Sequence, residues 1–248
     1  MTSGSQPMTS APPSGTHPDR WHRPDGRPAG SPTGTGRAGG VLFAVGGVVT
    51  AAGNIVHPTG GSASYHSSIA SQLANPVGTP AAWLTLVGSL LIAWGLWVLV
   101  DGAWRDAAPV VRVGARLAVL GSALLVVESA VTLAMRTAAV PYAAGTVVPM
   151  VRLSEVLYAG CLPALMLGAI LVNLGSPRLA PVVVRILGAI GMVAMALAGP
   201  LVDGIHTISL WPLYLGGALV CLWIVWVGVH QAMLGEGAAP RESDLRAA

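Results

Sequence analysis

Glu128 is the side chain with the clearest chemical potential, because it is an acid inside the apolar stretch LLVVESAVTLAMRT (residues 124–137). A charged residue at the centre of a membrane helix costs about 2.5–3.5 kcal/mol on insertion scales. We therefore expect Glu128 to face the interior of a helix bundle or a wet cavity, or to carry a proton. An acid in such a place is suited to donating or relaying protons.

Thr132 and Arg136 follow Glu128 at i+4 and i+8, so a helix places all three on one face. Arg136 lies about 12 Å above Glu128 on a straight helix, too far for direct pairing. Two interpretations remain open. One is a polar track that leads from the outer surface to Glu128. The other is a neutral acid that is hydrogen-bonded to a neighbouring helix as a packing contact.

Further polar side chains lie in or near the connections that we expect on the outer side of the membrane. They belong to the segments NIVHPTGGSASYHSSIA, VRLSEVLY and PLVDGIH (residues 54–70, 151–158 and 200–206). Histidine titrates near neutrality and can act as an acid or a base. Imidazoles with carboxylates also suit zinc. Because no predicted helix carries an HxxH or HExxH spacing, we expect neither a metal nor a cofactor.

The candidate site residues come from these segments and from the face of Glu128. The candidate catalytic residues are Glu128, Glu155, Asp203 and His206, and the candidate binding residues are His57, His66, Arg136, Arg152 and Tyr158. Arg152 and Glu155 stand at i, i+3 and are expected to pair with each other. The alternative is that Glu155 completes a site with Arg136.

The composition identifies lipid as the medium of the chain. Hydrophobic residues make up 53% of its 248 residues and charged residues only 9%, against about 25% charged in soluble domains. The net charge is +3, and the basic residues, all arginines, are scattered along the chain and not gathered in one patch. This pattern gives no reason to expect nucleic-acid binding.

Six apolar runs set the expected fold. They cover residues 38–56, 81–100, 115–136, 151–173, 183–201 and 209–231. Each is close to the roughly 20 residues that cross a hydrocarbon core, and the backbone in lipid must bond within the segment. We therefore predict an all-α polytopic membrane protein, a bundle of six transmembrane helices in a domain over residues 38–234. The polar segments 1–37 and 235–248 are predicted to be disordered cytoplasmic tails.

Arginine placement predicts the orientation. With both termini in the cytoplasm, eleven of the thirteen arginines fall on the inner side, and Arg136 and Arg152 alone fall outside. This asymmetry follows the positive-inside rule. We expect a multi-pass protein of the cytoplasmic membrane, with Trp83 and Trp211 at the outer interface and Trp104 at the inner interface. Four further tryptophans are expected toward the inner half, namely Trp94, Trp97, Trp223 and Trp226.

Two pairs of runs share a pattern that suggests an internal repeat. Residues 82–100 and 210–229 both place a glycine five residues after a tryptophan, and then a Trp-x-x-Trp pair. A parallel repeat would relate the first two predicted helices to the last two. The alternative is that interfacial tryptophans and a glycine-rich composition produce the match without common ancestry.

Two stretches resemble an uncharacterised, actinobacterial-type family of six-helix integral membrane proteins. They are RAGGVLFAVGGVVTAAGNIVHP (residues 37–58) and YAGCLPALMLGAILVNLGSPRLAPVVVRILGAIGMVAMAL (residues 158–197). The resemblance covers roughly residues 37–231, and its distinctive elements are the His-Pro loop and the SPRLA turn. The long N-terminal tail departs from the family. The resemblance implies the six-helix architecture and no particular activity.

Three classes of function are compatible with these residues. We expect first a non-catalytic accessory, sensory or binding protein, in which Glu128 affects only stability. The second is a membrane enzyme that acts on a lipid or isoprenoid with Glu128 as general acid. The third is a small transporter with Glu128 as its proton carrier. The expected partners are membrane lipids, with a hydrophobic small molecule as a further candidate, and the sequence identifies no protein partner.

Overall fold

The computed structural model describes residues 35–56, 65–204 and 211–234, except the side chains of residues 65–68, 198–204 and 211–214. All regular structure in this part of the chain is helical. The six long helices are α1 (Thr35–Val56), α3 (Gly78–Asp101), α4 (Pro109–Met135), α6 (Pro149–Gly175), α7 (Val182–Gly204) and α8 (Trp211–Leu234). Each predicted apolar run lies within or almost within one of these helices, which confirms the predicted fold class.

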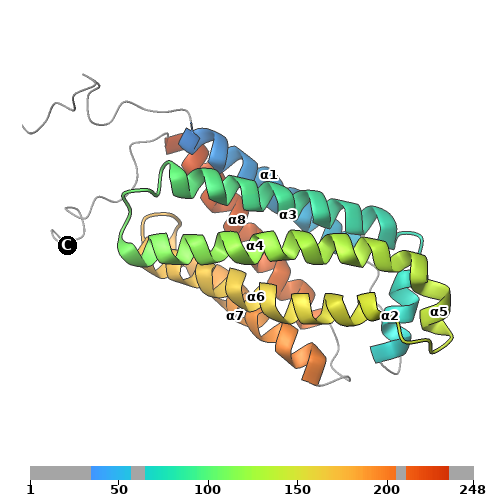
Figure 1. The fold of residues 1–248 in the computed structure, drawn as a ribbon. Coiled ribbons are helices and arrows are strands. Elements are labelled where there is room, and N and C mark those ends of the chain that lie inside the picture. Colours follow the sequence, from blue (N-terminus) through green and yellow to red (C-terminus); the bar gives the residue numbers. More distant parts are fainter. Residues whose placement is uncertain (1–34, 57–64, 205–210, 235–248) are drawn as a thin grey trace, which may run out of the picture. The chain divides into compact units, whose positions relative to one another are not determined.

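Three short elements were not predicted. They are α2 (Tyr65–Ala74), the 3₁₀ helix η1 (Arg136–Ala138) and α5 (Ala139–Ala143). All of them lie at the end of the bundle where α4 ends and α6 begins (Figure 1). Helix α4 also begins six residues before the predicted run, at Pro109. Proline is favoured at the first helical position, because that residue needs no backbone donor.

The long helices have the length and apolarity of membrane spans. Among the described residues, five segments qualify: Thr35–Val56, Gly78–Asp101, Pro109–Ala143, Pro149–Gly175 and Leu215–Met233. Their mean hydropathy runs from 1.6 to 2.0. The fully described part of α7, Val182–Leu197, is shorter and is also apolar. The chain is thus an all-α integral membrane protein.

The six long helices pack as a closed ring. Neighbouring pairs around it are α1 with α3, α3 with α4, α4 with α6, α6 with α7, α7 with α8, and α8 with α1. In Figure 1, α1, α4 and α7 begin at the end where α3, α6 and α8 finish. Sequence neighbours are therefore antiparallel, and α1 closes the ring by packing against the last helix.

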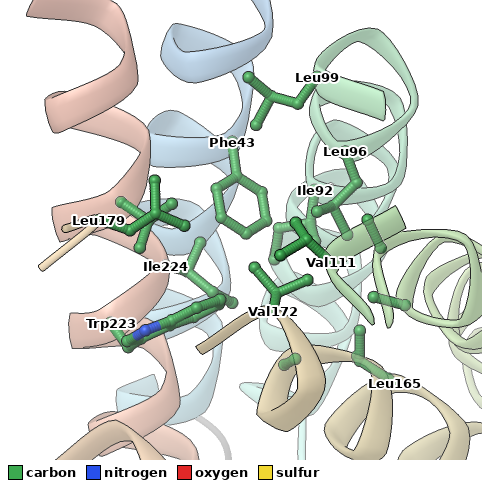
Figure 2. Close-up of a cluster of buried hydrophobic side chains, with 14 of the residues drawn as sticks. Phe43, Ile92, Leu96, Leu99, Val111, Leu165, Val172, Leu179, Trp223 and Ile224 are labelled. Atoms are coloured by element: carbon green, nitrogen blue, oxygen red, sulfur yellow. The ribbon is translucent and has the colours of Figure 1, made fainter. Parts of the chain in front are cut away.

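An apolar core fills the centre of this ring. Figure 2 shows Phe43 of α1, Leu96 of α3, Val172 of α6 and Trp223 of α8 converging on it. The rings of Phe43 and Trp223 meet edge to face, with 6.3 Å between their centroids. Edge-to-face packing is a favoured geometry for aromatic pairs. The core thus joins helices from both halves of the chain.

Helix α1 reaches both of its neighbours through glycines. A Cβ atom added at Gly46 would lie 2.7 Å from the backbone nitrogen of Ile92 in α3. One added at Gly40 would lie 2.6 Å from the backbone nitrogen of Ala232 in α8. No side chain fits at such distances, so glycine permits the close approach. Small residues are the usual means of packing helices in lipid, where the hydrophobic effect does not drive helices together.

The tryptophans are divided between the outer surface and the core. Trp83, Trp94, Trp97 and Trp226 are 42–59% exposed, as side chains facing lipid or its interface would be. Trp104 and Trp223, by contrast, are only 2% and 3% exposed, so neither side chain faces lipid. Both are held inside by the apolar core.

The repeat pattern has a counterpart in the packing. Gly88, five residues after Trp83, lies against the backbone of α1. Gly216, five residues after Trp211, lies against Gly191 and Ala194 of α7. In each hairpin this glycine therefore contacts the preceding long helix. A common origin of the two hairpins remains a prediction.

Candidate functional site

Glu128 faces α6 and not the lipid. Its side chain is on α4, and the residue is only 8% exposed. The hydroxyl of Thr132 donates a hydrogen bond to its Oε1 at 2.6 Å, and the hydroxyl of Ser154 on α6 donates to the same oxygen at 2.8 Å. The two hydroxyl oxygens are 3.2 Å apart. These three side chains form the Glu128 cluster.

A seam of small residues brings the members of this cluster together. On α4, Gly114, Gly121 and Glu128 recur every seven residues and share one face. A Cβ atom at Gly121 would collide with the backbone of Leu165 in α6, and one at Gly114 would lie 2.8 Å from the carbonyl oxygen of Gly168. The two backbones are therefore in close contact along two turns. This contact sets the separation at which the carboxylate meets Ser154.

Ser154 was missed by the sequence analysis, although it stands next to Glu155 in VRLSEVLY. A signal for it exists in α6, where Ser154, Cys161 and Gly168 also recur every seven residues. All three are buried. Since α6 runs antiparallel to α4, the first residue of the α6 series lies opposite the last residue of the α4 series. Ser154 is thereby placed opposite Glu128.

The chemistry of the Glu128 cluster is that of an interhelical hydrogen bond. Both hydroxyls use the same carboxylate oxygen, and within the described part of the chain no hydrogen bond reaches Oε2. The cluster contains neither an imidazole nor a cation. Its geometry therefore matches the second interpretation given above, an acid bonded to a neighbouring helix.

Arg136 does not continue a polar track toward Glu128. Arg136 directly follows the end of α4 at Met135, and its guanidinium donates a hydrogen bond to the backbone carbonyl of Asn75, which follows α2. It also lies directly against Gly78 at the start of α3. Arg136 thus connects the turn between α2 and α3 to the end of α4. Of the predicted face, Thr132 alone bonds Glu128.

Arg152 and Glu155 form the predicted i, i+3 pair, with 2.9 Å between Nη1 and Oε2. The Arg152 side chain is 76% exposed and that of Glu155 only 10%. The alternative pairing of Glu155 with Arg136 is not formed. Tyr158 is half-buried one turn further along α6 and has interactions of its own.

The remaining candidates lie largely beyond the described structure. His57 and His206 fall outside the described residues. His66 is in α2 and Asp203 in α7, but their side chains are not described. In the part of the chain that is described, no three His, Cys, Asp or Glu side chains gather as metal ligands would. That His57, His66 and His206 lie together on the outer side of the membrane therefore stays a prediction.

A second polar network, outside the candidate site, links three helices at the opposite end of the bundle. The side-chain nitrogen of Asn173 in α6 donates to the carbonyl of Arg185 in α7 at 3.1 Å. The guanidinium of Arg185 donates back to the carbonyl of Asn173, through Nη2 at 2.9 Å. The indole of Trp223 in α8 donates to Oδ1 of Asn173 at 3.2 Å. Asn173 therefore holds α6, α7 and α8 together.

The central cavity of the ring is small and apolar. It has a volume of about 20 Å³, little more than one water molecule requires. Phe43, Leu96, Met166 and Trp223 are among the side chains that line it. A lipid chain or an isoprenoid does not fit in this space. The cavity is also separate from Glu128, which is not among its lining residues.

Comparison of the chain with protein-family models, curated proteins and solved structures finds no match. The resemblance of residues 37–58 and 158–197 to a six-helix membrane family therefore stays a prediction.

Proposed function

We propose that this chain is a non-catalytic protein of the cytoplasmic membrane, an accessory or binding component whose buried acid stabilises the bundle. One observation carries the proposal: Oε1 of Glu128 already accepts hydrogen bonds from Thr132 and Ser154 across the closely packed α4–α6 contact. An acid that served as proton donor to a substrate would need access to that substrate. The apolar cavity gives no such access, since Glu128 does not line it.

The dispersal of the candidate catalytic residues supports this proposal. Glu155 is paired with Arg152, and Arg136 is bonded to the carbonyl of Asn75. Among the described side chains, therefore, no second acid or base approaches Glu128 closely enough to form a hydrogen bond. An enzyme site requires such groups to converge on one reacting atom.

Replacing Glu128 with glutamine tests the proposal. Glutamine keeps an oxygen for the two hydroxyls, so Glu128→Gln should unfold in detergent within about 1 kcal/mol of the parent protein. Glu128→Ala removes that acceptor and leaves the hydroxyls of Thr132 and Ser154 with only each other to bond, which should cost about 1–3 kcal/mol. Asp106→Asn, at an exposed acid that has no hydrogen bond or ion pair among the described residues, is the control for removing an acid, with an expected cost below 1 kcal/mol.

A transport assay separates this proposal from a proton-coupled transporter. Parent protein and Glu128→Gln are reconstituted in liposomes that contain a pH-sensitive dye, and a pH gradient is imposed. We expect both proteins to dissipate the gradient no faster than empty liposomes. A proton flux in the parent that is lost in Glu128→Gln would overturn the proposal and assign Glu128 to transport.

A further inference from the structure

One end of the bundle is strongly basic. It is the end where α1 begins, α3 finishes, α4 begins and α8 finishes, at the left of Figure 1. The described arginines at this end are Arg37, Arg105, Arg112, Arg116, Arg178 and Arg185. They are accompanied by two acids, Asp101 and Asp106, which leaves a net charge of +4. The opposite end has Arg136 and Arg152 and the acids Glu155 and Asp203, so the positive charge of the described residues is concentrated at one end.

Two of these arginines stand together on the outward face of α4. Arg112 and Arg116 are exposed and one helical turn apart, a spacing that makes side chains neighbours. Within the described residues, neither guanidinium has an ion pair or a hydrogen bond. Each presents several donors in one plane, a geometry that suits the oxygens of a phosphate. The pair is therefore a cationic site without a protein partner in the described structure.

The same face of α4 turns apolar toward the middle of the bundle. Leu120 follows Arg116 by one turn and is 55% exposed, and Val127 continues the face at 50%. The outward stripe thus begins with two cations and continues with hydrocarbon side chains. A free phosphate would use only the first part of this stripe. A phospholipid would use both parts, its headgroup on the arginines and its acyl chain along Leu120 and Val127.

The neighbouring helix α3 adds interfacial side chains at matching depths. Trp97 and Trp94 of α3 are both 59% exposed. They lie about 6 Å and 10 Å from the end of α3, and Arg112 and Arg116 lie about 5 Å and 10 Å from the start of α4. Because α3 and α4 are adjacent and antiparallel, the two pairs share the same layer. Tryptophan favours the headgroup level of a bilayer.

We propose that Arg112 and Arg116, with the exposed apolar face of α4 below them and Trp94 and Trp97 beside them, form a binding site for one anionic phospholipid. The arginines bind the negatively charged phosphate of the headgroup, and the apolar stripe takes an acyl chain. Basic sites between membrane helices are a recognised means of binding acidic lipids. The proposal is independent of Glu128, and a failure of either proposal leaves the other standing.

Lipid titration of the purified full-length protein tests this site. Phosphatidylglycerol and phosphatidylcholine with identical acyl chains are added to the protein in a nonionic detergent, and bound lipid is counted by native mass spectrometry. We expect tighter binding of phosphatidylglycerol by the parent protein. Each arginine near an acidic headgroup contributes roughly a fivefold gain in affinity, so Arg112→Gln with Arg116→Gln should weaken phosphatidylglycerol binding roughly 30-fold.

Three comparisons make the result specific. Arg152→Gln removes an exposed arginine at the opposite end and should leave phosphatidylglycerol binding unchanged. Phosphatidylcholine binding should be the same in the double variant as in the parent, which also shows that the fold is intact. Soluble glycerol phosphate should not displace the bound lipid. Equal losses in Arg152→Gln, no preference for phosphatidylglycerol, or displacement by glycerol phosphate would each overturn the proposal.

Discussion

At the scale of single residues, the chain places its few polar groups where a neighbouring helix can bond them. Ser154 donates to Glu128, and Asn173 accepts from Trp223. Hydrogen bonds between membrane helices are worth on average about 0.6 kcal/mol and at most about 1.7 kcal/mol. Each contact is therefore a modest contribution that also specifies which faces of the helices meet.

Ser154→Ala should remove the interhelical bond of the Glu128 cluster and lower the free energy of unfolding by about 0.6 kcal/mol. Thr132 would still occupy Oε1, so the loss should be smaller than that of Glu128→Ala. Unfolding in detergent, followed by circular dichroism, measures both. If the two substitutions made in one protein cost as much as the sum of their separate costs, Ser154 and Glu128 would not be coupled as the structure has them.

Asn173→Ala should cost about 1–3 kcal/mol, because the indole of Trp223 and the carbonyl of Arg185 lose their partner while remaining in the interior. Trp223 would also enter a changed environment, which its fluorescence should report. Asn75→Ala is a suitable comparison. Among the described residues, the Asn75 side chain makes one hydrogen bond, a local one from the backbone nitrogen of Val77, so its replacement should leave tryptophan emission unchanged.

At the scale of helices, the α4–α6 contact depends on the absence of side chains. Gly121→Ala would push a methyl group into the backbone of Leu165. The two helices would have to separate, at a cost of about 1–3 kcal/mol, and the bond between Ser154 and Glu128 would lengthen. Gly160→Ala is the matched control, since nothing lies within 4 Å of the atom it adds. Thermal unfolding of both variants tests this prediction. Equal stability of the two variants would show that α4 and α6 are not in close contact at Gly121.

The sequence could predict the long helices but not how they face one another. Apolar runs and arginine placement are properties of each segment, so all six helices were found. The pairing of Glu128 with Ser154 depends on the rotation of α6 against α4, to which residues far apart in the chain contribute. Arg136 binds a backbone carbonyl, which leaves no trace in the side-chain pattern. The short helices α2 and α5 were not predicted, because they are short and their apolar and polar residues do not form a clear helical pattern.

At the scale of the whole molecule, the distribution of charge predicts which end faces the cytoplasm. Six described arginines lie at the end where α1 begins and two at the other. The positive-inside rule then places the basic end in the cytoplasm. Orientation is open to chemical labelling, because the native cysteines Cys161 and Cys221 are buried and free. They should not react with a membrane-impermeant maleimide.

A cysteine introduced at Arg105, in the exposed turn between α3 and α4, should be labelled only after cells are permeabilised. One introduced at Val147, which is 81% exposed between α5 and α6, should be labelled in intact cells. Labelling of the parent protein is the background to subtract. The reverse result would place the basic end outside and contradict the predicted orientation.

The packing of α1 between α3 and α8 also has a consequence for biosynthesis. Helix α1 precedes α8 by more than 150 residues and leaves the ribosome well before it. The glycine face of α1 that contacts α8 therefore has no partner until α8 has been translated. Nascent chains released before α8 would leave that face open to lipid or to other proteins. The packing of α1 thus depends on the synthesis of α8, and chains truncated before α8 should be preferred substrates of membrane proteases.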